Sequence, residues 1–241
     1  MQPFGILTAL ADLAQPDRLL SSGLPGPLGQ VVALLGIALL LTGFAVAFAR
    51  QVREYITAYL IQSLVITAIA VAVGIGTLRW DLFLVAALTC LVKVILIPRL
   101  LWAVGRRLPE QRERVPLTNV LVSLLVALAL TAIAFFTAPT VVAPGTVLNE
   151  PPLAISVTLV LIGLFILSAR RHVLAQVVGL LTIENGLFSG AIAIVYGMPL
   201  LVEFGILFDV LVAVVVLTLL VTMLHRTVTS ADTLDLRRLR G

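Results

Sequence analysis

Apolar residues fall into long blocks along this chain, and short charged or turn-forming segments separate the blocks. Each block is roughly 20 residues long, which is the length of α-helix that crosses the hydrocarbon core of a bilayer. Apolar and polar positions do not alternate within the blocks, so the pattern does not predict the strands of a membrane β-barrel. We therefore predict an all-α fold, a polytopic membrane bundle of about seven transmembrane helices. The predicted spans are 29–49, 54–78, 81–104, 116–138, 151–169, 172–197 and 200–224.

Composition supports a membrane protein and excludes several other classes. Hydrophobic residues make up 61% of the chain, charged residues make up 12%, and mean hydropathy is +1.17. The single cysteine, Cys90, cannot form a disulfide or a multi-cysteine metal site within the chain. His172 and His225 have no second ligand three or four residues away, and no motif of a catalytic site occurs. We expect no metal, no cofactor and no catalytic residue.

The basic residues predict the topology. The sequence pI is about 10.0, but the arginines cluster at the ends of apolar blocks rather than forming a stripe, so we expect no nucleic-acid partner. Most of them follow the first, third, fifth and seventh spans, and the positive-inside rule places these segments in the cytoplasm. We therefore expect an external N-terminus and a cytoplasmic C-terminus in the cytoplasmic (inner) cell membrane. The arginines on the predicted cytoplasmic side are Arg50, Arg53, Arg106, Arg107, Arg112, Arg114, Arg170, Arg171, Arg226, Arg237, Arg238 and Arg240.

Proline and glycine divide the chain into segments. We predict that residues 1–28 form an interfacial segment and that residues 29–138 form a four-helix membrane extension. Residues 139–152 are rich in proline and glycine and predict an outer loop. Residues 153–241 predict a three-helix membrane module with a cytoplasmic tail.

The two halves show a weak internal similarity. Leu41-Thr42-Gly43 matches Leu161-Ile162-Gly163, and a similar offset places Gln62-Ser63 opposite Glu184-Asn185. Both units start on the same side of the membrane, so the pattern predicts a parallel repeat.

Four ionisable residues lie inside or near the ends of predicted spans: Lys93, Glu184, Glu203 and Asp209. A charge at the centre of a bilayer costs about 2.5–3.5 kcal/mol on insertion scales, so such residues face a partner, a cavity or another subunit. A rise of about 1.5 Å per residue places Lys93, Glu184 and Asp209 at similar depths near the midplane. We therefore predict a proton relay through Glu184, Asp209 and Lys93. Glu203 lies closer to the interface and is a possible accessory group.

Purely structural interpretations of these charges stay open at this point. Glu184 and Asp209 could form hydrogen bonds between helices, and Lys93 could be a counter-ion to one of them. Lys93 could face Glu184 or another subunit. Gly186 and Gly190 form a G-x-x-x-G pattern, which predicts the close approach of another helix beside Glu184.

The C-terminal third resembles the K-type (chain 4L) subunit of respiratory complex I. The matching pieces are Arg170-Arg171, the run 178–185 that ends at Glu184-Asn185, Phe208-Asp209, and the tail 233–241. That family carries one membrane glutamate in its second helix and another in its third. The resemblance places Glu184 on the first of these positions and Asp209, an aspartate instead of a glutamate, on the second.

The chain as a whole resembles hydrogenase-4 component E, a longer K-like subunit of group 4 hydrogenase and formate hydrogenlyase complexes. The resemblance rests on Gln62-Ser63-Leu64-Val65, the run 92–98 around Lys93, Glu184-Asn185-Gly186, and the run 201–206 around Glu203. It implies a non-catalytic membrane subunit of an energy-converting redox complex. The implied partners are antiporter-like and quinone-module-like membrane chains, together with peripheral hydrogenase and iron–sulfur subunits.

Two other functions fit the same residues. A multisubunit cation/proton antiporter uses a related K-like chain, although that chain is usually short and the four-span extension argues against it. A structural scaffold needs the buried charges only to fix helix register. A stand-alone secondary transporter fits less well, because no span is interrupted at matching positions of the two halves.

Overall fold

The computed structural model describes residues 27–78, 80–106, 119–141 and 150–194, and these residues are helical apart from short connections. Six of the predicted spans are present as helices that are long and apolar enough to cross a membrane, and the predicted seventh span lies outside the described residues. The helices are α3 (Pro27–Phe48), α4 (Val52–Thr77), α5 (Trp80–Thr89), η1 (Cys90–Leu96), α6 (Ile97–Gly105), α7 (Val120–Val141), α8 (Glu150–Ala169) and α9 (Val173–Ile194). The all-α prediction is confirmed for the described part of the chain.

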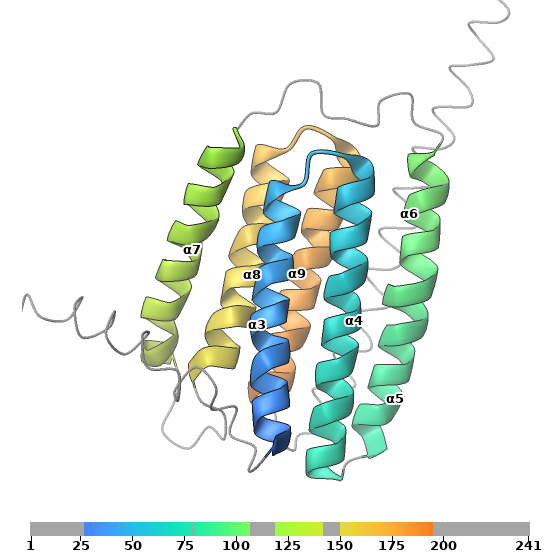
Figure 1. The fold of residues 1–241 in the computed structure, drawn as a ribbon, viewed down its shortest axis with the longest axis vertical. Coiled ribbons are helices and arrows are strands. Elements are labelled where there is room, and N and C mark those ends of the chain that lie inside the picture. The colour runs from blue at the N-terminus through green and yellow to red at the C-terminus, as the bar shows by residue number, and fades with distance from the viewer. Residues whose placement is uncertain (1–26, 79, 107–118, 142–149, 195–241) are drawn as a thin grey trace, which may run out of the picture.

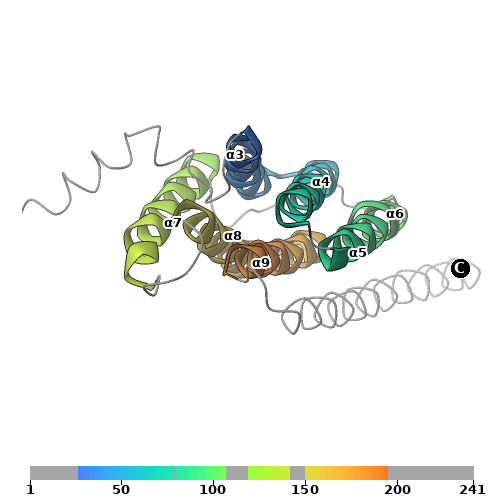
Figure 2. The same ribbon diagram turned by 90° about the horizontal axis from the view of Figure 1, so that it is seen from below.

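Two helical hairpins form the centre of the bundle. The α3–α4 hairpin packs against the α8–α9 hairpin, with α3 beside α8 and α4 beside α9 (Figures 1 and 2). Helix α7 packs beside α8, and the continuous rod α5–η1–α6 packs beside α4. The two hairpins are the segments that the internal similarity pairs, and they run in the same direction through the bundle (Figure 1).

One end of the bundle gathers the arginines. The α3–α4 connection, the α8–α9 connection and the end of α6 lie together there (Figure 1). We call this the Arg-rich end, defined by Arg50, Arg53, Arg106, Arg170 and Arg171. The same end is the one that the positive-inside rule predicts to be cytoplasmic, and the orientation in the membrane stays a prediction.

Helix α4 has a defined start and stop. Gln51 and Glu54 form a capping box, in which the Glu54 carboxylate accepts backbone N–H groups of Gln51 at 3.1 Å and Arg50 at 2.7 Å. Leu78 ends the helix in the left-handed conformation, with φ of 53°, and its N–H bonds the carbonyl of Gly74. The strong cap fixes where α4 leaves the Arg-rich end, and so fixes which residues face the core.

The α8–α9 hairpin is the most tightly packed pair of helices. A Cβ on Gly186 would lie 2.9 Å from the backbone oxygen of Ser156, and one on Gly163 would lie 2.7 Å from the backbone oxygen of Gly179. The close approach beside Glu184 that the glycine pattern predicts is therefore present, and α8 is the helix that approaches.

The predicted outer loop 139–152 is shorter than its proline content indicates. Helix α7 continues to Val141, and α8 starts at Glu150, so helices enter this segment from both sides. The α8 boundary has a simple cause: Pro151 and Pro152 stand in the first turn, where proline is tolerated because N–H groups there have no intrahelical acceptor.

Candidate functional site

The rod that carries Lys93 is a π-helix at that point. The helix η1 spans Cys90–Leu96, and the N–H of Ile97 bonds the carbonyl of Val92 five residues back. Pro98 follows in the first turn of α6 and has no N–H to give to the carbonyl of Val94, so the α-helical bond is lost there. Wide turns of this kind are rare and often mark functional sites. No sequence pattern predicted this one, because the segment is apolar on nearly all sides.

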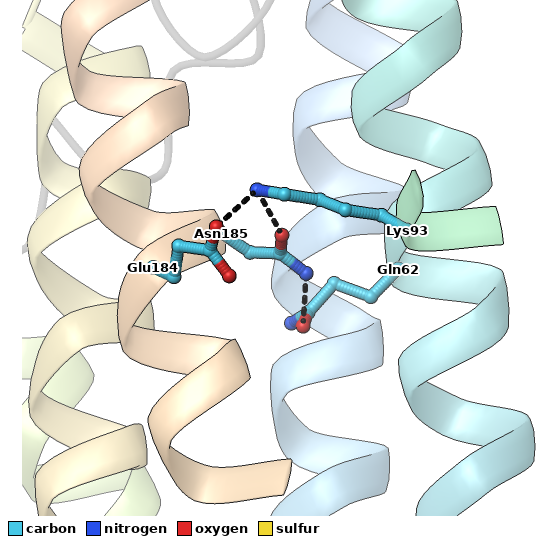
Figure 3. Close-up of polar contacts among 4 residues, drawn as sticks. All are labelled: Gln62, Lys93, Glu184 and Asn185. Atoms are coloured by element: carbon cyan, nitrogen blue, oxygen red, sulfur yellow. Dashed lines mark hydrogen bonds and ion pairs between the residues drawn. The ribbon is translucent and has the colours of Figure 1, made fainter. Parts of the chain in front are cut away.

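Lys93 crosses the bundle to reach α9. Its Nζ lies 3.2 Å from Glu184 Oε1, and the two side chains are 1% and 2% exposed (Figure 3). Nζ also donates to Asn185 Oδ1 at 3.2 Å and lies 5.0 Å from the centre of the Phe188 ring. A lysine on the rod and a carboxylate on α9 therefore form a buried ion pair, which confirms the similar depths predicted for these two residues.

Two amides extend this polar cluster to α4. Asn185 Nδ2 donates to Gln62 Oε1 at 3.0 Å (Figure 3). The orientation of the Asn185 amide is fixed by chemistry, because Lys93 can only donate and so must meet the amide oxygen. Gln62 must then accept with its own oxygen. The lysine, the carboxylate and the two amides come from three elements, and neither Gln62 nor Asn185 was among the predicted site residues.

The cluster lies between two apolar clusters. The one toward the Arg-rich end includes Leu101 and Leu181, and the one toward the opposite end includes Val85 and Phe188. Charges surrounded in this way are screened little by solvent, and each depends on its partner for stabilisation. The site can hold a positive charge on the amine directly beside a negative charge on the carboxylate.

The other predicted relay residue, Asp209, and the accessory residue Glu203 lie outside the described residues. Among the described residues there is no group of three histidine, cysteine, aspartate or glutamate side chains that could hold a metal ion.

A second buried charge stands at the Arg-rich end. Arg170 is 1% exposed, and its guanidinium donates to the carbonyl of Ala47 at 2.8 Å and to Ser123 Oγ at 3.4 Å. It therefore ties the α8–α9 connection to the end of α3 and to α7, and its positive charge meets the negative end of the α3 dipole. The sequence marked Arg170 only as a topology signal, because nothing in the local pattern shows that a loop arginine is buried.

Comparisons with known proteins identify relatives over most of the chain. No protein-family model matches it, and no solved structure matches it. An uncharacterized protein of Mycobacterium tuberculosis is 36% identical over 205 residues, which cover 84% of this chain and 92% of that protein. Hydrogenase-4 component E of Escherichia coli K12 is 29% identical over 213 residues, which cover 88% of this chain and 98% of that protein. With matches of this length and the all-helical, membrane-length bundle described above, the chain belongs to the hydrogenase-4 component E family.

Proposed function

We propose that this protein is a non-catalytic, multi-pass membrane subunit of a hydrogenase-type energy-converting complex, in which it passes protons or charge between neighbouring membrane subunits. The observation that carries the proposal is the buried pair of Lys93 and Glu184, 3.2 Å apart and 1% and 2% exposed. The family relation supports membership in a hydrogenase complex, because a relative of nearly the same length is a hydrogenase component. The membrane is the cytoplasmic (inner) membrane, with the Arg-rich end on the cytoplasmic side.

The pair suits charge relay because either member responds to a third charge nearby. A proton or cation that approaches Glu184 weakens the electrostatic attraction between the Glu184 carboxylate and the Lys93 ammonium. The lysine then releases a proton or moves away. Long-range interactions of this kind are strong where water is excluded, since the local dielectric is low. Asp209 on the predicted last helix supplies the second carboxylate, and Glu203 an accessory group nearer the interface. Electron transfer takes place in other subunits of the complex.

The first experiment is purification of the complex in mild detergent through a tag on this chain, followed by mass spectrometry of the co-purifying proteins. We expect antiporter-like membrane chains together with hydrogenase or iron–sulfur subunits. Recovery of antiporter-like chains without any redox subunit would instead make this protein part of a cation/proton antiporter.

The second experiment tests the relay itself with Glu184→Gln in the complete complex. The amide keeps the shape and accepts a hydrogen bond, but it carries no negative charge and cannot be the protonated and deprotonated station that a carboxyl group can be. We expect assembly and redox turnover to persist, while proton translocation into sealed vesicles falls at least about tenfold, in the range that loss of a positioned proton-transfer group produces. Thr182→Val is a matched control, because Thr182 is buried on the same helix and its hydroxyl donates to the carbonyl of Val178 at 2.8 Å within that helix. Normal translocation by the assembled Glu184→Gln complex would leave a scaffold role for the pair.

A further inference from the structure

A polar stripe runs along the core-facing side of α4 from the Arg-rich end to the Lys93 site. Tyr55, Tyr59 and Gln62 lie within about 60° of one another around the helix axis, at about 100° per residue. Ser63 lies at the edge of the same face. All four are buried, with exposed fractions of 1%, 0%, 0% and 0% in chain order.

The stripe becomes apolar beyond Gln62 and Ser63. On the same face, toward the opposite end, α4 carries Ile66, Ile69, Ala70 and Val73, all of them buried. Of these residues, Ile66, Ile69 and Val73 pack in the apolar cluster that also contains Val85 and Phe188. The core-facing side of α4 is therefore polar between the Arg-rich end and the Lys93 site, and apolar between the site and the opposite end.

The polar half of the stripe is joined to the ion pair by hydrogen bonds. Gln62 accepts from Asn185, and Asn185 accepts from Lys93. From Tyr55 to Gln62 the distance along the axis is about 10 Å, and Tyr55 lies only one turn from the capping box that starts the helix. Two tyrosines and two further polar residues thus lie on this face of α4 between the Arg-rich end and the site.

Packing alone does not account for these groups. Tyr55 and Tyr59 lie in an apolar cluster with Ile56, Leu101 and Leu174, where phenylalanine would fill nearly the same volume. A hydroxyl buried there needs a hydrogen-bond partner, whereas a phenylalanine ring does not. In the part of the chain that the structure describes, Ser63 Oγ and Gln62 Nε2 form no hydrogen bond with protein atoms. Hydroxyl and amide groups in a row can pass a proton, because each accepts one as it gives up its own.

We propose that Tyr55, Tyr59, Ser63 and Gln62 form the proton-access route from the Arg-rich end to the Lys93–Glu184 pair, with the opposite end closed by the apolar half of the same stripe. This assignment rests on the proposed relay function, since it names the side from which that site is supplied. No group on the route keeps a charge, so one proton is exchanged at the pair for each one exchanged at the Arg-rich end. The bonds donated from Lys93 to Asn185 and from Asn185 to Gln62 are aligned for release from the pair, and uptake follows when the two amides have turned over.

Proton exchange of a cysteine thiol tests the route without reference to coupling. In the complete complex, with the native Cys90 replaced (Cys90→Ser), we would introduce Ser63→Cys or, as the matched control, Ile66→Cys. Infrared spectroscopy would follow conversion of S–H to S–D after transfer into D₂O. Ser63→Cys should exchange at least about tenfold faster than Ile66→Cys, because both are buried on the same face but only Ser63 is on the route. Equal exchange rates would overturn the proposal.

Removal of one hydroxyl tests the tyrosines. Adding Tyr59→Phe to Ser63→Cys should slow exchange at the thiol about tenfold, whereas adding Thr158→Val, which removes a buried hydroxyl bonded to the carbonyl of Ala154, should leave the rate unchanged. In the otherwise native complex, Tyr59→Phe should also slow proton translocation while redox turnover in uncoupled membranes is kept.

The outcomes for the route and for the relay are distinguishable. Loss of translocation in Glu184→Gln with no effect of Tyr59→Phe on exchange or translocation would keep the relay and reject the route. Slower thiol exchange in Tyr59→Phe with normal translocation in Glu184→Gln would keep proton access along α4 and reject the relay.

Discussion

Removing one member of the Lys93–Glu184 pair should destabilise the protein more than removing both. In Lys93→Met, the buried Glu184 carboxylate loses the amine 3.2 Å away, and in Glu184→Gln the buried Lys93 ammonium loses the carboxylate. Removing one partner of a buried ion pair costs roughly 3–5 kcal/mol, because the remaining charge is no longer compensated by the other.

The double variant Lys93→Met/Glu184→Gln leaves no buried charge at this position. Its cost should fall to about 1–2 kcal/mol, the range for an amide group left short of a hydrogen bond. The assay is the midpoint of thermal unfolding of the detergent-solubilised complex, followed by a fluorescent thiol probe or by light scattering, with Thr182→Val as the control. Two results are expected together: both single variants are less stable than the double variant, and Thr182→Val is nearly native. A double variant whose loss equals the sum of the two single losses would refute the reasoning, because it would mean that the two charges do not interact.

Three further predictions concern packing and hydrogen bonding away from the ion pair. Arg170→Ala should lower the free energy of unfolding by about 2–5 kcal/mol, because two hydrogen bonds of a buried guanidinium are lost. Arg171→Ala, at the exposed neighbouring residue, should lower it by less than about 0.5 kcal/mol. Thermal unfolding measures both variants, and equal effects would contradict the burial of Arg170. Gly163→Ala should lower the free energy of unfolding by about 1–3 kcal/mol, since the added Cβ would lie 2.7 and 2.9 Å from backbone atoms of α9. Gly36→Ala should be nearly neutral, because its Cβ would meet only the end of the Ile155 side chain at 3.3 Å. A neutral Gly163→Ala in the same unfolding assay would show that α8 and α9 separate easily. Gln62→Leu should cost about 1–3 kcal/mol because the Asn185 amide loses its acceptor; a nearly native Gln62→Leu in the same unfolding assay would argue against this hydrogen bond.

The helices were predictable from the sequence because a bilayer imposes one length scale on all of them. Predicted spans 54–78 and 151–169 agree with α4 and α8 to within two residues, and the starts of these helices coincide with capping or proline signals. The fourth span starts later than predicted, at Val120, and Asn119 accepts the first helical bond from the N–H of Ser123. Asparagine at that position is a common helix start, but a uniform apolar run gave no reason to choose it.

The candidate site was predictable only in part. A charge within an apolar run is conspicuous, and the depth of each charge follows from the rise of a helix, so Lys93 and Glu184 could be placed at one level. The direction in which each side chain points could not be derived, because it depends on the helical register, and the π-helix shifts that register by one residue. The two amides were missed for a different reason. Gln62 and Asn185 are uncharged and stand out little in sequence, although the internal similarity already placed Gln62-Ser63 opposite Glu184-Asn185.

The π-helix also determines how easily Lys93 can move. A segment with five-residue hydrogen bonds can return to four-residue bonds locally, and such a step turns the side chains within it by about 100° around the axis. Pro98 has no N–H to offer in either arrangement, so no bond to that residue has to be broken. The lysine could therefore swing away from Glu184 while α5 and α6 stay in place against α4. Transfer of charge in this protein would then need the rotation of a single helical turn and no displacement of a whole helix through the lipid.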